Sequence, residues 1–104
     1  MPEPETTRLP RMWRPQPGDT LAGFISERHS RPSDYTEEDV TVLVVDQLDT
    51  AVSVWCSTRQ LRDLVEENDP QSGDFLELRY DGQEWIKFIN AYKKIYTYRV
   101  TKAS

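Results

Sequence analysis

Apolar and polar residues alternate through much of the chain with a period of two, which is typical of β-strands. In TLAGFISERH, the residues Leu21, Gly23 and Ile25 share one face, and a glycine inside a strand indicates a bulge or a sharp bend. The run VTVLVVDQLD at residues 40–49 is apolar on both faces, so we expect a strand covered on both sides. AVSVWCS at residues 51–57 follows after a short turn, and the two runs are predicted to form a hairpin.

Helical spacing is found in the segment TRQLRDLVEEND. Its residues Leu61, Leu64 and Val65 form one apolar stripe, which predicts an amphipathic helix. Ser57 followed by Gln60 fits a capping box at the start of this helix. The Asn-Asp-Pro sequence that follows predicts its end.

The part of the chain after the helix predicts two further strands. GDFLELRYDG is expected to form the fourth strand, with a turn at Asp81 and Gly82. An excursion or a short strand through Trp85 and Phe88 follows. The last strand is expected at residues 92–101, where the pattern alternates again.

Two segments are predicted to lack regular structure. Residues 1–17 hold five of the seven prolines, which argues against a helix or a central strand and predicts an extended arm. SRPSDYTEED at residues 30–39 is polar and acidic, and is predicted to be a long loop. We therefore expect an arm at residues 1–17 and one folded domain at residues 18–104.

The order of three strands, a helix and two more strands indicates a mainly β fold. A small sheet with one inserted helix is expected to close on itself to hide its free edges. The predicted fold is a five-stranded, OB-fold-like closed barrel with one α-helix between strands 3 and 4. At 104 residues, the chain has the size of one such domain.

Charge and cysteine content narrow the function classes. The formal net charge is −5, but residues 84–104 carry five basic groups against Glu84 alone. This balance disfavours tight non-specific attachment to a polyanion, while the basic end could still form a local patch. The single cysteine excludes an intrachain disulfide and favours a cytoplasmic location. Because no apolar run reaches about 20 residues, no membrane association is expected.

The segments WRPQPGDTLAGFI, VTVLVVD, VSVWCSTRQLRDLVEE and SGDFLELRYDG, with the later YTYRV, resemble small OB-fold proteins of actinobacteria and their phages. Several members of that group are described as binding single-stranded DNA. The resemblance spans most of residues 13–100, and its motifs mark turns and strands rather than a catalytic centre. It implies the OB fold and single-stranded DNA as the ligand.

Trp55 is the first candidate binding residue, because it lies out of phase with the core positions Val52, Val54 and Cys56. This alternation sends its indole to the outer face, which carries the ligand in an OB barrel. Phe24 on the first strand would join it there as a second stacking surface for bases. The alternative is that the proline-rich arm folds back and covers Trp55.

Aromatic rings beside basic side chains form a second set of candidates. Bases could stack on the rings while ammonium and guanidinium groups contact phosphates. These residues are Trp85, Lys87, Lys93, Lys94 and Arg99 near the last strand, with Trp13 and Arg14 in the arm. Alternatively, the lysines are simply solvated and the rings complete the core.

An enzyme is not expected. His29 is the only histidine, and Cys56 alternates as a small core residue with no base beside it in the sequence. No cofactor or metal site is predicted. The favoured function is binding of single-stranded nucleic acid, with DNA ahead of RNA. The alternative is an OB-type module that binds a protein partner or a second copy without nucleic acid.

Overall fold

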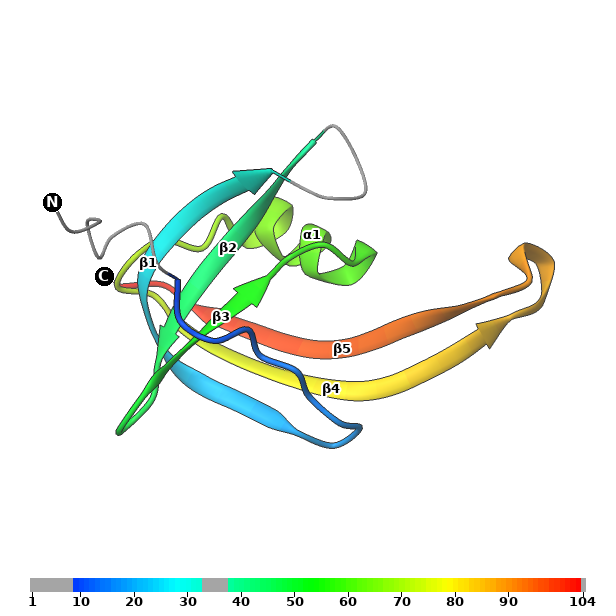
Figure 1. Ribbon diagram of the computed structural model, residues 1–104, viewed down its shortest axis with the longest axis horizontal. Coiled ribbons are helices and arrows are strands. Elements are labelled where there is room, and N and C mark those ends of the chain that lie inside the picture. Colours follow the sequence, from blue (N-terminus) through cyan, green and yellow to red (C-terminus); the bar gives the residue numbers. More distant parts are fainter. Residues whose placement is uncertain (1–8, 33–37, 104) are drawn as a thin grey trace, which may run out of the picture.

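Five antiparallel strands form one curved sheet in the order β3-β2-β1-β4-β5 (Figure 1). The structure is a computed structural model that describes residues 9–32 and 38–103. Its elements in chain order are β1 (Thr20–Pro32), β2 (Asp39–Asp46), β3 (Ala51–Trp55), α1 (Arg59–Asn68), β4 (Phe75–Ile86), the 3-10 turn η2 (Lys87–Ile89) and β5 (Ala91–Thr101). The mainly β class, the β2–β3 hairpin and the helix between strands 3 and 4 are confirmed.

The sheet bends at β1. Residues 20–24 of this strand pair with β4, and residues 24–32 pair with β2. The register with β2 shifts between Ile25 and Glu27, so the chain has a β-bulge there. Gly23 lies just before the bulge, where the backbone of β2 approaches so closely that an added Cβ would collide with a carbonyl oxygen. The bend expected at this glycine therefore reflects a close approach followed by a bulge.

The main core lies between α1 and the concave face of the sheet (Figure 1). Its buried members are Leu21, Ile25, Leu43, Val45, Val52, Val54, Cys56, Leu61, Leu64, Leu76 and Leu78. Val42 and Val44 are also buried, although they point to the other face of β2 and lie outside this cluster. The prediction that this strand is covered on both sides is confirmed.

The predicted closure of the sheet into a barrel is wrong, because β3 and β5 do not pair. The free side of β3 is occupied by the arm: the Trp13 N–H donates to the Ser53 carbonyl at 2.9 Å, and the Ser53 N–H donates to the Arg11 carbonyl at 2.9 Å. On β5, the Tyr96 N–H donates to Oε1 of Gln60 on α1 at 2.6 Å. The arm and the helix therefore take the places at which the two strands would have met.

The arm is extended where the structure describes it, at residues 9–17. Met12 forms a parallel bridge with Ser53. The rest of the predicted arm, residues 1–8, and half of the predicted acidic loop, residues 33–37, lie outside the described residues. The loop was predicted too long, because residues 30–32 belong to β1 and residue 39 begins β2.

The turn predicted at Asp81 and Gly82 is wrong, because β4 continues to Ile86. The register with β5 shifts between Tyr80 and Gly82, so this position is a bulge within a long hairpin. The carboxylate of Asp81 accepts a hydrogen bond from the Thr97 hydroxyl on β5 at 2.6 Å, which ties the bulge to the neighbouring strand. The outer half of the β4–β5 hairpin extends away from the rest of the molecule (Figure 1).

The helix α1 begins without the predicted capping box. Its N-cap is Thr58, which makes no side-chain capping bond, and the side chain of Gln60 accepts from β5 instead. The predicted end is confirmed: Asp69 adopts a left-handed conformation with φ of 43°. No helix in the described part of the chain has the length and apolar character needed to span a membrane.

Asp74 fastens the end of the chain to the start of β4. Its buried carboxylate accepts from the Lys102 ammonium at 2.6 Å and from the backbone N–H groups of Gln71 and Ala103 at 2.9 Å. The bond from Lys102, followed by those from the backbone, lowers the pKa of Asp74 to about 2. Lys102 also donates to the carbonyl of Asn68, so it joins β5 to the end of α1.

Candidate functional site

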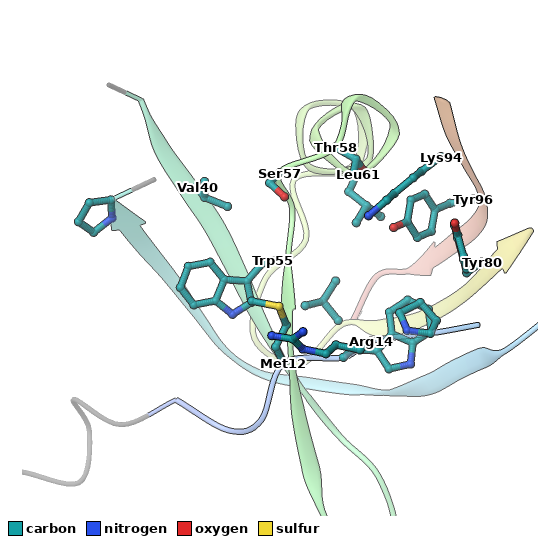
Figure 2. A pocket seen from close by; sticks show the side chains of 14 residues that line it. Met12, Arg14, Val40, Trp55, Ser57, Thr58, Leu61, Tyr80, Lys94 and Tyr96 are labelled. Carbon is teal, nitrogen blue, oxygen red and sulfur yellow. The ribbon is translucent and has the colours of Figure 1, made fainter. Parts of the chain in front are cut away.

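A cleft of about 630 Å³ opens between β3 and β5, where the barrel would have closed; we call it the seam cleft (Figure 2). Residues 12–15 of the arm line it, together with residues from every strand and from the start of α1. Trp55 lies on one side of the opening, and Tyr80 and Tyr96 lie on the other (Figure 2). The cleft exists because the arm and α1 separate the two strands without filling the space between them.

Trp55 points away from the core residues of its own strand, as its position in the alternation predicts. Its indole is half-buried, and its Nε1–H donates to Oγ of Ser53 at 3.2 Å. The Ser53 hydroxyl in turn donates to the carbonyl of Pro10 at 2.8 Å. The arm thus lies beside Trp55 and helps to hold its ring, while the ring still lines the cleft.

The charged groups of the seam cleft are both cations. Among the described residues that line it, Arg14 and Lys94 are charged and none is acidic. Neither forms an ion pair with any residue that the structure describes. In a chain with a formal net charge of −5, the cleft therefore carries a local excess of positive charge.

Two tyrosines form the wall opposite Trp55. The rings of Tyr80 and Tyr96 have centroids 5.2 Å apart and are tilted by 43°. Burial raises the pKa of the Tyr96 phenol, so its hydroxyl keeps its proton at neutral pH. The wall therefore offers aromatic surface and a neutral hydroxyl rather than negative charge.

The aromatic surface continues along the β4–β5 hairpin. Tyr96, Lys94 and Tyr92 occupy alternate positions of β5, which places their side chains on one face. Trp85 lies opposite Tyr92 in the register, and the two rings meet edge to face with centroids 5.0 Å apart. At about 3.4 Å per residue, this exposed pair lies roughly 14 Å beyond Tyr96 along the strand.

The candidates predicted from the sequence divide between the seam cleft with its adjoining hairpin and the rest of the surface. Trp13, Arg14, Trp55 and Lys94 line the seam cleft, and Trp85 lies further along the hairpin. Lys93 occupies the opposite face of β5 from Lys94, and Lys87 lies in the turn η2.

Phe24 and Arg99 lie on the convex face, away from the seam cleft. Phe24 is paired with Asp46, whereas Trp55 is paired with Val42, four residues away along β2. These two β2 positions are an even number of residues apart, so Phe24 and Trp55 lie on the same face of the sheet, roughly 13 Å apart along the strand, but Phe24 does not line the seam cleft. The Arg99 Nε lies 3.8 Å from a carboxylate oxygen of Glu77, so its charge is partly matched.

Met12 and Tyr80 line the seam cleft although sequence reasoning did not select them. Met12 is adjacent to a candidate, Trp13, and that position was the available signal. Tyr80 alternates with Leu76 and Leu78 as a core residue, and its pattern gives no sign of a role in a cleft.

The thiol of Cys56 is expected to be unreactive in the folded protein. Burial raises its pKa to about 12, so almost no thiolate is present at neutral pH. We expect labelling by Ellman's reagent at pH 8 to be slow in buffer and rapid in guanidinium chloride. Rapid stoichiometric labelling of the native protein would contradict this assignment of Cys56 to the core.

No protein family, curated protein or solved structure matches this chain in the three comparisons made.

Proposed function

We propose that this protein binds single-stranded nucleic acid in the seam cleft and along the adjoining face of the β4–β5 hairpin. The observation that carries the proposal is the charge of the cleft. Arg14 and Lys94 lie there without a carboxylate among the described lining residues, although the chain as a whole is acidic. Cations of this kind contact the phosphates of a nucleic acid. Their binding releases the counterions held by those phosphates, and this release favours the complex.

Aromatic rings along the same path support a single strand rather than a duplex. Trp55 and Tyr96 line the cleft, and the Trp85–Tyr92 pair follows on the hairpin. Unpaired bases stack on such rings with little dependence on sequence, whereas bases in a duplex already stack on one another. The alternation of Tyr92, Lys94 and Tyr96 on one face of β5 combines stacking surfaces with a cation, as proteins that bind single strands do.

The preference for DNA over RNA comes from the resemblance described above. The alternative ligand is an apolar peptide, which would use the Met12, Trp13 and Leu61 side chains of the same cleft. Phosphate contacts distinguish the two, because salt weakens them far more steeply than it weakens apolar contacts.

Binding is tested by fluorescence anisotropy of a labelled thymidine oligomer of about 25 nucleotides, beside a duplex of equal length. We expect the single strand alone to bind, more weakly as salt is raised. Trp55→Ala should weaken binding about 5- to 150-fold, which is the effect of losing one stacked base. Phe24→Ala is the matched control, since it removes an exposed ring that does not line the seam cleft. Absence of binding at low salt would refute the proposal.

The salt dependence should identify which cation contacts phosphate. Each neutralised phosphate of a single strand contributes about −0.7 to the slope of log K against log salt concentration. We therefore expect Lys94→Gln to make the slope shallower by about 0.7. Arg99→Gln removes a cation from the other face of the same strand, and the slope should then stay as it is. Equal effects of both variants would show that only the overall charge matters.

A further inference from the structure

The turn at the end of the β4–β5 hairpin exposes apolar side chains that the proposed function does not use. Phe88 is 92% exposed and Ile89 is 56% exposed, although both are large and apolar. Lys87 precedes them in the same 3-10 turn. We call residues 87–89 the tip. Exposed apolar surface of this kind marks an interaction site more often than an isolated surface residue does.

A second exposed apolar surface lies on the convex face. Phe24 is 59% exposed and meets Phe75 edge to face, with ring centroids 5.0 Å apart. Asp46 lies directly opposite Phe24 on β2, and Glu77 lies two residues from Phe75 on the same face of β4. We call these four residues the Phe24 patch.

The tip and the Phe24 patch lie too far apart to meet within one molecule. Phe75 is paired with Thr101 at one end of the hairpin, and Ile86 is paired with Ala91 at the other. Phe75 and Ile86 are eleven positions apart along an extended strand, which corresponds to roughly 36 Å. Only the tip of another molecule can therefore reach the patch.

The two surfaces are complementary in charge. Lys87 and Lys93 lie at and beside the tip, where Glu84 is opposite Lys93 in the register, which leaves the tip net positive. Asp46 and Glu77 belong to the Phe24 patch, where Arg99 lies 3.8 Å from Glu77, which leaves the patch net negative. Lys87, Lys93 and Asp46 form no ion pair with any other residue in the described part of the chain. An apolar centre with opposite charges around it is the composition expected of two matching surfaces.

We propose that the tip of one copy of this chain docks on the Phe24 patch of a second copy. The contact joins two different surfaces, so it closes only if two copies engage each other reciprocally, and otherwise continues as a chain of molecules. It is small, so we expect weak association that depends on concentration. The proposal does not depend on nucleic-acid binding in the seam cleft.

Sedimentation velocity from micromolar to millimolar protein at low salt tests the contact. We expect the average mass of the unmodified protein to rise with concentration. Lys87→Glu alone and Asp46→Lys alone should each weaken association by about tenfold or more, because like charges then face each other. An equimolar mixture of the two variants should associate again, since the altered tip of one matches the altered patch of the other.

Arg59→Glu is the control, because Arg59 is an exposed cation on α1, away from both surfaces. It should associate as the unmodified protein does. A protein that stays monomeric throughout, or variants whose mixture does not associate, would overturn the proposal. So would a loss of oligonucleotide affinity on Phe88→Ser in protein that is already monomeric, because the tip would then serve nucleic acid.

Discussion

Alanine at position 23 is expected to lower the free energy of unfolding by more than about 3 kcal/mol, which is a large part of the stability of a small domain. An added Cβ would collide with the carbonyl oxygen of Asp46 and lie 3.0 Å from Cγ1 of Val45. The oxygen belongs to the backbone of β2, so rotating a side chain cannot relieve the collision. The paired strands β1 and β2 would have to move apart at the bend of the sheet.

Thermal unfolding followed by circular dichroism measures this effect. For a domain of this size, a loss of 3 kcal/mol corresponds to a fall in Tm of roughly 12 °C or more. Ala22→Ser is the matched control, because Ala22 precedes Gly23 on β1 and its side chain is exposed. A Tm of Gly23→Ala within a few degrees of the control would show that β1 does not approach β2 as closely as described.

Asp74→Asn is expected to destabilise the protein by about 2 kcal/mol at pH 7. The folded protein lowers the pKa of this carboxyl from 3.8 to about 2, chiefly through the bond from Lys102. A lowered pKa means that folding favours the ionised form. An amide keeps the shape of the side chain but loses this charge, and its NH₂ group cannot accept from the N–H groups that face it.

The same shift predicts how stability depends on pH. The contribution of Asp74 is complete above about pH 4, where the unfolded chain is ionised as well. It is lost as the pH falls through the folded pKa of about 2. Urea unfolding at pH 7, 4 and 2 should therefore give curves for the unmodified protein and Asp74→Asn that converge at the lowest pH.

Other carboxylates contribute to the acid unfolding of both proteins, so only their difference reports on Asp74. Asp69 and Asp81 have lowered pKa values too, through hydrogen bonds with Arg28 and Thr97 respectively. A difference between the two proteins that stayed constant down to pH 2 would contradict the role given to the Lys102 bond.

Local patterns in the sequence predicted the elements, because strands and helices depend on residues close together in the chain. The alternation of Val52, Val54 and Cys56 correctly placed the side chain of Trp55 outside the core. The apolar stripe of Leu61 and Leu64 correctly predicted the buried face of α1.

The closure of the sheet could not be predicted, because it depends on contacts between distant segments. Nothing near Ser53 indicates that its backbone would bond to the arm rather than to another strand. The Asp81-Gly82 pair suits a turn and a bulge equally well, so the length of the hairpin was also not apparent.

The same limit applies to the candidate site. Arg99 was expected to contact phosphate, but the alternation does not say which face of β5 borders the seam cleft, and Arg99 lies on the face that does not. Tyr80 and Met12 reach the seam cleft only because the sheet stays open between β3 and β5. Side-chain positions that follow from the alternation within one β-strand were thus predictable. Those that follow from the absence of pairing between β3 and β5 were not.

An open sheet normally carries a hazard that a barrel avoids, since unpaired strand backbones recruit strands from other molecules and lead to aggregation. Here the Ser53 backbone N–H and carbonyl are already bonded to the arm, and the Tyr96 N–H is bonded to a glutamine of the helix. Both outermost strands are therefore blocked at their centres against uncontrolled β-addition. The chain can keep a permanent opening in its sheet and still resist the growth of fibrils from it.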